Sequence, residues 1–116
     1  MNIETLREYC LSKPGAQESF PFGNETLVFK VGGKAFALAA IDSHPLSVNL
    51  KCDPEKAIQL REAYESVRPG YHMNKTHWNT VLSTGEIRDS LLREWIDDSY
   101  ELVRKSLPKA VREQLI

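Results

Sequence analysis

Cysteine and long apolar runs are scarce in this sequence, and each shortage excludes a class of protein. The two cysteines, Cys10 and Cys52, form no CxxC pair, so we expect neither a zinc site nor a redox motif. The longest apolar run, from Ala35 to Ile41, is far too short to span a bilayer. The first residues carry acid early and no apolar segment, so we expect no signal peptide and predict a cytoplasmic protein without membrane contact.

Motifs for catalysis and for cofactor binding are also missing. The sequence contains no GxSxG nucleophile elbow and neither of the glycine-rich phosphate-binding motifs. Of the three histidines, His72 and His77 lack the i, i+4 spacing of a helical metal pair, and His44 lies far from both in the sequence. We therefore predict a protein that is not an enzyme and that binds no metal and no other cofactor.

The composition is that of an ordinary globular domain. The chain has 116 residues, of which 41% are hydrophobic and 27% are charged, and its net charge is −1. A chain of this length can bury one core, and it shows no repeat or linker, so we predict a single domain over residues 1–116. The net charge gives no overall attraction to nucleic acid.

Helix-capping residues and proline- or glycine-containing turns divide the chain into short predicted helices and strands. Asn2 predicts a helix start, and Pro14-Gly15 predicts its end. Gly32-Gly33 is typical of a two-residue hairpin turn, and Asp53-Pro54 of a helix start with a cap. The alternation and helical periodicity between them predict strands over residues 25–31, 34–41, 46–52 and 76–82, and a long helix over residues 88–106 followed by a short one.

The predicted order is α-β-β-β-α-β-α-α, which favours an α+β fold: one antiparallel sheet with helices packed on one face. We expect Trp95 and Ile96 of the long helix to be buried against the sheet. The other face would be open, with small or basic side chains: Thr26, Lys30, Ala37, Ala39, Ser47, Asn49 and Lys51. The predicted strands are net positive and the predicted helices net negative. One interpretation is that acid merely solvates the helices, and another is that a basic sheet face meets an anionic partner.

The segment from Arg68 to Trp78 is the densest mixture of polar and aromatic groups. One interpretation is structural, with Tyr71 and Trp78 as rings of the core or its edge and Asn74 bonded to loop backbone. The other is contact with an anion or nucleic acid. Under the second interpretation the candidate binding residues are Lys30, Lys34, Lys51, Arg68, His72, Asn74, Lys75 and His77.

Several blocks of the sequence resemble one known family. They are Lys13-Pro14-Gly15, Phe22-Gly23, the block from Tyr71 to Trp78 (YHMNKTHW), and the late block from Asp98 to Val103. Through these blocks the chain resembles the MmcQ/YjbR family, and the resemblance covers essentially the whole chain. The resemblance implies a CyaY-like (frataxin-like) α+β fold and a "double wing" protein that is commonly labelled DNA-binding.

The residues and the resemblance together lead to three functional hypotheses. The first is a DNA-binding module of modest, largely non-specific affinity, with lysines on phosphates. The second is a protein–protein interaction module or regulatory adaptor. The third is a domain that binds a small anionic ligand. The second and third would use the open sheet face and the 71–78 loop.

Overall fold

Ten helices and strands make up the part of the chain that the structure, a computed structural model, describes, namely residues 1–115. They are α1 (Ile3–Leu11), β1 (Ala16–Ser19), β2 (Thr26–Val31), β3 (Lys34–Ala40), β4 (Ser47–Lys51), α2 (Pro54–Ala63), β5 (Val67–Pro69), β6 (Trp78–Leu82), α3 (Asp89–Ser106) and α4 (Lys109–Glu113). The predicted class, a mixed α+β fold, is confirmed.

All six strands form one antiparallel sheet in the order β1-β2-β3-β4-β6-β5. The predicted strands β2, β3, β4 and β6 are its four central strands, so the prediction that they share one sheet is confirmed. The predicted element order was wrong in missing the two edge strands. β1 is short and shows no clear alternation, and β5 ends at Pro69, a residue that predicts a break but is tolerated on an edge strand.

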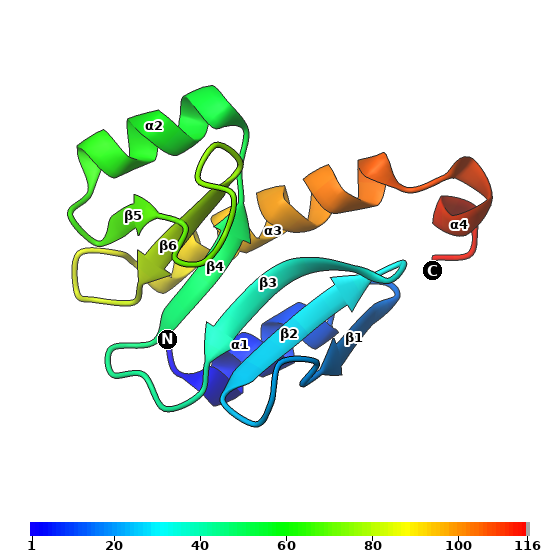
Figure 1. Cartoon of the computed structure of the whole chain (residues 1–116), viewed down its shortest axis with the longest axis horizontal. Coiled ribbons are helices and arrows are strands. Elements are labelled where there is room, and N and C mark those ends of the chain that lie inside the picture. Colours follow the sequence, from blue (N-terminus) through cyan, green and yellow to red (C-terminus); the bar gives the residue numbers. More distant parts are fainter. Residues whose placement is uncertain (116) are drawn as a thin grey trace.

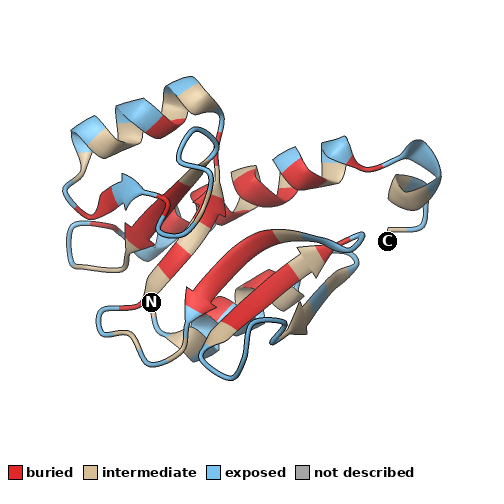
Figure 2. Cartoon of the chain, viewed as in Figure 1, coloured by how far each residue is buried: buried red, intermediate tan, exposed pale blue. Residues whose placement is uncertain are grey.

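The long helix α3 crosses one face of the sheet. In Figure 1 α1 and α3 lie behind the strands, and α3 contacts β2, β3 and β4. Figure 2 shows buried positions along β2, β3 and α3, and Trp95 and Ile96 are buried as predicted. Helices therefore cover this face and leave the opposite one open.

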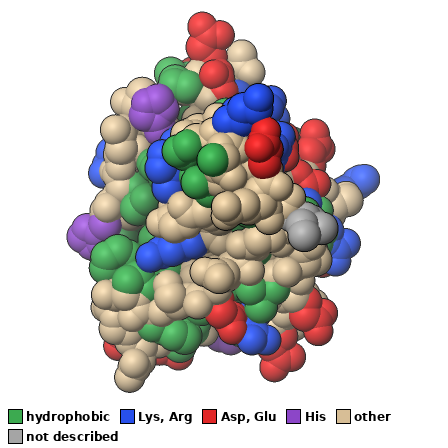
Figure 3. Space-filling model, turned by 90° about the vertical axis from the view of Figure 1, so that its right-hand side faces the viewer, with side chains coloured by type: hydrophobic (Ala, Val, Ile, Leu, Met, Phe, Trp, Pro, Cys, Tyr) green, Lys and Arg blue, Asp and Glu red, His purple; other side chains and the backbone are tan. Residues whose placement is uncertain are grey.

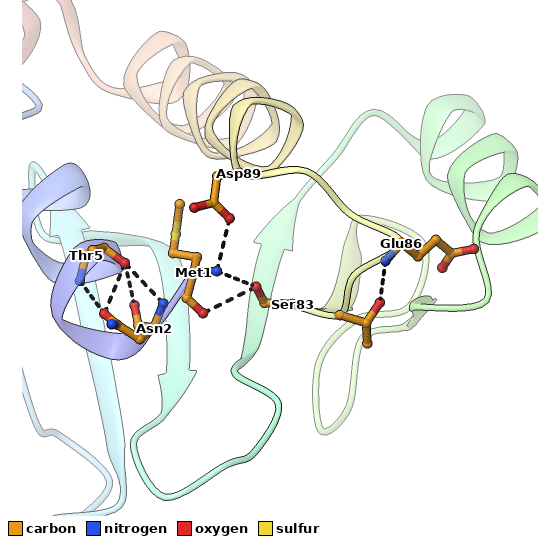
Figure 4. Close-up of polar contacts among 7 residues, drawn as sticks. Met1, Asn2, Thr5, Ser83, Glu86 and Asp89 are labelled. Carbon is orange, nitrogen blue, oxygen red and sulfur yellow. Dashed lines mark hydrogen bonds and ion pairs between the residues drawn. The ribbon is translucent and has the colours of Figure 1, made fainter.

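The helix starts follow the predicted capping residues. Asn2 forms a reciprocal capping box with Thr5, and Asp53 accepts a hydrogen bond from the Lys56 backbone at the start of α2. Figure 4 shows the capping box beside the Met1 amino nitrogen, which donates to Ser83 after β6 and to Asp89, the first residue of α3. These contacts join the start of the chain, ahead of α1, to the end of β6 and the first turn of α3.

Ser99 of α3 bonds to both β3 and β4 at the point where these two strands separate. The pairing of β3 with β4 stops at Ala37 and Leu50. Beyond that point the Ser99 hydroxyl donates to the Phe36 carbonyl at 2.6 Å and accepts from the Lys51 amide at 2.8 Å. A buried backbone group without a partner is costly, so this fully buried serine replaces a missing rung of the ladder.

Candidate functional site

The open face of the sheet carries a continuous row of side chains across all six strands. Residues directly opposite on neighbouring strands share a face. Starting from Val28, the register places on one face Ser19, Val28, Leu38, Asn49, Thr80 and Arg68. The row is therefore apolar over β2 and β3, polar over β4 and β6, and cationic at the β5 edge.

The prediction that Ala37 and Ala39 lie on the open face was wrong. Both are fully buried, because they pair with Phe29 and Leu27 on the helix-covered face. A register shift between Phe29 and Lys30 marks a bulge, and an extra residue on β3 reverses the alternation beyond it. The side chains that β3 presents to the open face are those of Ala35, Leu38 and Ala40, which pair with Lys30, Val28 and Thr26.

A groove of about 750 Å³ lies on this open face. Val28 and Leu38 line it and are only 1% and 8% exposed, although they lie outside the core cluster beneath the helices. Two loops complete it, the β1–β2 connection with Pro21 and Phe22, and the β5–β6 connection with Tyr71, His72 and Met73. Phe22 and Tyr71 are 75% and 69% exposed. The groove thus combines a hidden apolar floor with two accessible aromatic rings.

A closed set of hydrogen bonds holds the second loop on the sheet. The Tyr71 amide donates to the Thr80 hydroxyl at 2.9 Å, and that hydroxyl donates to Asn49 Oδ1 at 2.5 Å. Asn49 Nδ2 in turn donates to the Tyr71 carbonyl at 3.4 Å. In Figure 1 the connection between β5 and β6 passes in front of β4. The position of Tyr71 is therefore set by polar residues of the open face.

The neighbouring His72 has a left-handed backbone, with φ of 57°. This region is uncommon for a residue other than glycine. The Tyr71 and His72 rings lie with their centroids 4.0 Å apart. The two rings form a compact aromatic pair at the edge of the groove.

The structure brings together only some of the predicted binding residues. Lys30 and His72 line the groove. Lys51 and Arg68 belong to the same face, because Lys51 lies two residues from Asn49 and Arg68 pairs with Thr80.

The other four predicted residues lie at the periphery. Lys34 follows the hairpin turn between β2 and β3, and Lys75 and His77 are exposed in the β5–β6 connection. Asn74 is engaged in that turn, where its Oδ1 accepts from the Thr76 amide at 2.9 Å. Residues 71–78 thus form a turn with its own internal hydrogen bonds, and the groove receives only its first part.

Sequence reasoning missed the groove and both of its aromatic rims as parts of one site. Phe22 was singled out only in the Phe22-Gly23 block of the family resemblance, and Val28 and Leu38 only as positions within predicted strands. The segment Phe20-Pro21-Phe22 could have indicated an exposed aromatic site, because two phenylalanines in a short loop between strands are hard to bury together.

The cations of the open face and its loops differ from those near the helices. Within residues 1–115, no ion pair involves Lys30, Lys34, Lys51, Arg68 or Lys75. By contrast, carboxylates pair with cations in or beside the helices: Arg7, Lys13, Lys56, Arg104 and Lys109. In Figure 3 histidines lie along the left-hand margin with hydrophobic and basic side chains, and most acidic side chains gather elsewhere.

Other chemistry finds little support in the described residues. Burial raises the pKa of the Cys10 thiol to about 12 and also raises that of Cys52, so neither is a ready nucleophile. Over residues 1–115, no group of three or more His, Cys, Asp or Glu side chains is placed to hold a metal ion. No helix in that range is both long and apolar enough to cross a membrane.

The fold and this face define an α+β protein with an antiparallel sheet, helices on one side and a grooved, acid-poor surface on the other. The chain belongs to the YjbR family, whose sequence model matches residues 11–102. The family resemblance read from the sequence is thereby confirmed.

The chain is similar to curated relatives over most of their length. It is 43% identical over 106 residues to the uncharacterised protein YbdF of Escherichia coli O157:H7, covering 91% of this chain and 87% of YbdF. It is 36% identical over 116 residues to the uncharacterised protein YjbR of Escherichia coli K12, covering 100% of this chain and 98% of YjbR.

Solved structures share the architecture. The crystal structure of the Deinococcus radiodurans protein DR2400, with a DUF419 domain, superposes with a TM-score of 0.92 at 44% identity. That match covers 97% of this chain and 86% of DR2400. A crystal structure of a Pseudomonas syringae protein gives a TM-score of 0.77 at 28% identity, over 89% of this chain and 99% of that one.

Proposed function

We propose that this protein is a nucleic-acid-binding module of modest, largely sequence-independent affinity that uses the open face of its sheet. The supporting observation is the distribution of charge. The cations of this face and its loops enter no ion pair within residues 1–115, and no acidic side chain lines the groove. Unpaired lysines are free to replace the counterions of a phosphate backbone.

The phosphate contacts come from the open face and from the two turns beside it, where Lys34 pairs with the core residue Val31 at the tip of the β2–β3 hairpin. Lys30 and Lys51 lie on the face itself, Lys34 extends from the β2–β3 hairpin as on a wing, and Lys75 extends from the β5–β6 loop. Four such contacts predict a log–log salt dependence with a slope of roughly −3 to −4 on duplex DNA. Such binding falls in the non-specific range, with Kd of roughly 10⁻⁴ to 10⁻⁶ M at physiological salt.

Fluorescence anisotropy with labelled oligonucleotides at several salt concentrations tests this function. Replacing Lys30, Lys34 or Lys51 by alanine should weaken binding to every sequence and reduce the salt slope by about one. Lys105→Ala is the matched control, because Lys105 is an exposed lysine on helix α3, which covers the opposite face of the sheet. Absence of binding even at low salt, where attraction is least screened, would exclude the proposal.

A second candidate is a small anionic ligand held in the groove. The volume of about 750 Å³ lies within the usual range of small-molecule sites, and Lys30 and His72 supply polar groups beside an apolar floor. A thermal-shift screen with a panel of nucleotides and metabolites tests it. Stabilisation by one class of compound, lost in Lys30→Ala and kept in Lys105→Ala, would support this candidate.

A further inference from the structure

The groove on the open face differs in chemistry from the phosphate-binding surface around it. Lys30 is the one lysine or arginine among its lining residues, and its floor is formed by Val28 and Leu38 with the small side chains of β3. A phosphate would gain little from such a lining, whereas a flat apolar group would bury the exposed surface of Phe22 and Tyr71 above this floor. The groove therefore suits an apolar part of the ligand, whereas the lysines contact its phosphates.

Two exposed aromatic rings identify that part. Phe22 and Tyr71 line the groove yet are 75% and 69% exposed, so most of their surface is available to a ligand. Nucleic-acid bases stack on such rings without much regard to sequence, because every base has a π-face. The hydrogen bonds from Thr80 and Asn49 already fix the Tyr71 backbone, so less freedom is lost when its ring is covered.

A duplex keeps its bases stacked inside and does not present one to a groove, whereas a single strand does. On the basis of the function proposed above, we infer that the groove receives an unpaired base, stacked on Phe22 and Tyr71 over the Val28–Leu38 floor. Lys30 on the groove wall then meets the adjoining phosphate. The protein binds single-stranded nucleic acid more tightly than duplex as a result.

Anisotropy with a labelled oligothymidine of about 12 nucleotides and with its duplex tests the inference, since that length is within the usual site size of such grooves. Phe22→Ala and Tyr71→Ala should each weaken single-strand binding by roughly 5- to 150-fold, the affinity lost per stacked base. Duplex binding should change by less than about twofold, because it depends on phosphate contacts. Lys34→Ala should weaken both forms.

Phe20→Ala is the matched control. Phe20 lies in the same loop and is 48% exposed, but it does not line the groove. This variant should leave both affinities unchanged. A second readout is the fluorescence of a single 2-aminopurine in the oligonucleotide, which should be quenched by the parent protein and recover in Tyr71→Ala. Circular dichroism melts of each variant establish that the fold is kept.

The outcomes separate this inference from the proposed function. Equal binding of both forms, with Phe22→Ala and Tyr71→Ala silent and lysine variants weakened, overturns the inference and leaves the function standing. No binding of either form at low salt overturns both. A mononucleotide that binds as tightly as the oligomer, or a dimer in sedimentation that Phe22→Ala dissociates, also overturns the inference, because the groove then serves another occupant.

Discussion

The two faces of the sheet bury apolar side chains by different means, and β2 shows the difference within two consecutive residues. Phe29 and Val28 are 0% and 1% exposed. Phe29 belongs to the main core beneath the helices, where its ring centroid lies 6.5 Å from that of Phe36. Val28 lies outside that core, on the floor of the groove between two loops. Equal burial thus has two meanings: one side chain belongs to the main core, and the other lies outside it, beneath the groove of the opposite face.

The sharpest test of this comparison is to truncate both residues. Phe29→Ala should lower the free energy of unfolding by about 3–5 kcal/mol, the usual cost of a large cavity in a packed core. Val28→Ala should cost about 1.5 kcal/mol, the transfer free energy of two carbons, because loops can close over the smaller side chain. Urea denaturation measures both. Equal costs would show that the groove floor is an ordinary part of the core.

Ser99 tests how strongly the helix-covered face depends on α3. Ser99→Ala removes the hydroxyl that bonds both the Phe36 carbonyl and the Lys51 amide beyond the end of the β3–β4 pairing. Leaving buried groups unpaired should cost about 1–3 kcal/mol. Ser90→Ala, an exposed position on the same helix, is the control and should cost under about 0.5 kcal/mol. A similar loss in both variants would assign the effect to the helix itself.

Local signals explain why much of the helix-covered face could be predicted from the sequence. Helix caps and hairpin turns depend on a few neighbouring residues, so Asn2, Asp53 and Gly32-Gly33 were interpreted correctly. The wide apolar stripe of α3 indicated which side would be buried, and Ile96 is fully buried on it. These features need no knowledge of distant strands.

The open face depends on long-range pairing, which the sequence does not display. The run from Ala35 to Ala40 is apolar throughout, so nothing in it reveals which residues face which side or where the bulge lies. The edge strand β5 is recognisable only through its pairing with β6. The groove arises because the loops that carry Phe22 and Tyr71, far apart in the sequence, line the same part of the open face. Lys30 was predicted from strand alternation and local charge, and the shape of the groove was not predicted.

The hairpin that carries Lys34 offers a smaller test. Gly32 and Gly33 both have positive φ, at 57° and 81°, so alanine at either position should cost roughly 1–2 kcal/mol. A Cβ at Gly32 would also lie 2.6 Å from Leu107 Cδ1, whereas a Cβ at Gly33 would meet nothing within 4 Å. Thermal melts should therefore rank Gly32→Ala below Gly33→Ala in stability. The reverse order would mean that the hairpin does not rest on the helix-covered side.

The smallest expected effect concerns the β5 edge, which carries Arg68 to the open face. Glu86 accepts hydrogen bonds from the Ser66 amide at 2.9 Å and the Glu65 amide at 3.4 Å, and the Ser66 bond holds the pKa of Glu86 below its ordinary value. A carboxyl whose pKa is lowered on folding stabilises the fold above its unfolded pKa, and this contribution disappears as pH falls through the folded pKa. Glu86→Gln should therefore be slightly less stable than the parent at pH 7, and the two proteins should converge below about pH 4, near the range where free glutamate is protonated. Glu62→Gln, at an exposed position of α2, is the matched control. Urea midpoints measured from pH 3 to pH 7 check this, and a constant gap between Glu86→Gln and the parent across that range would mean that the charge of Glu86 does not hold the edge strand.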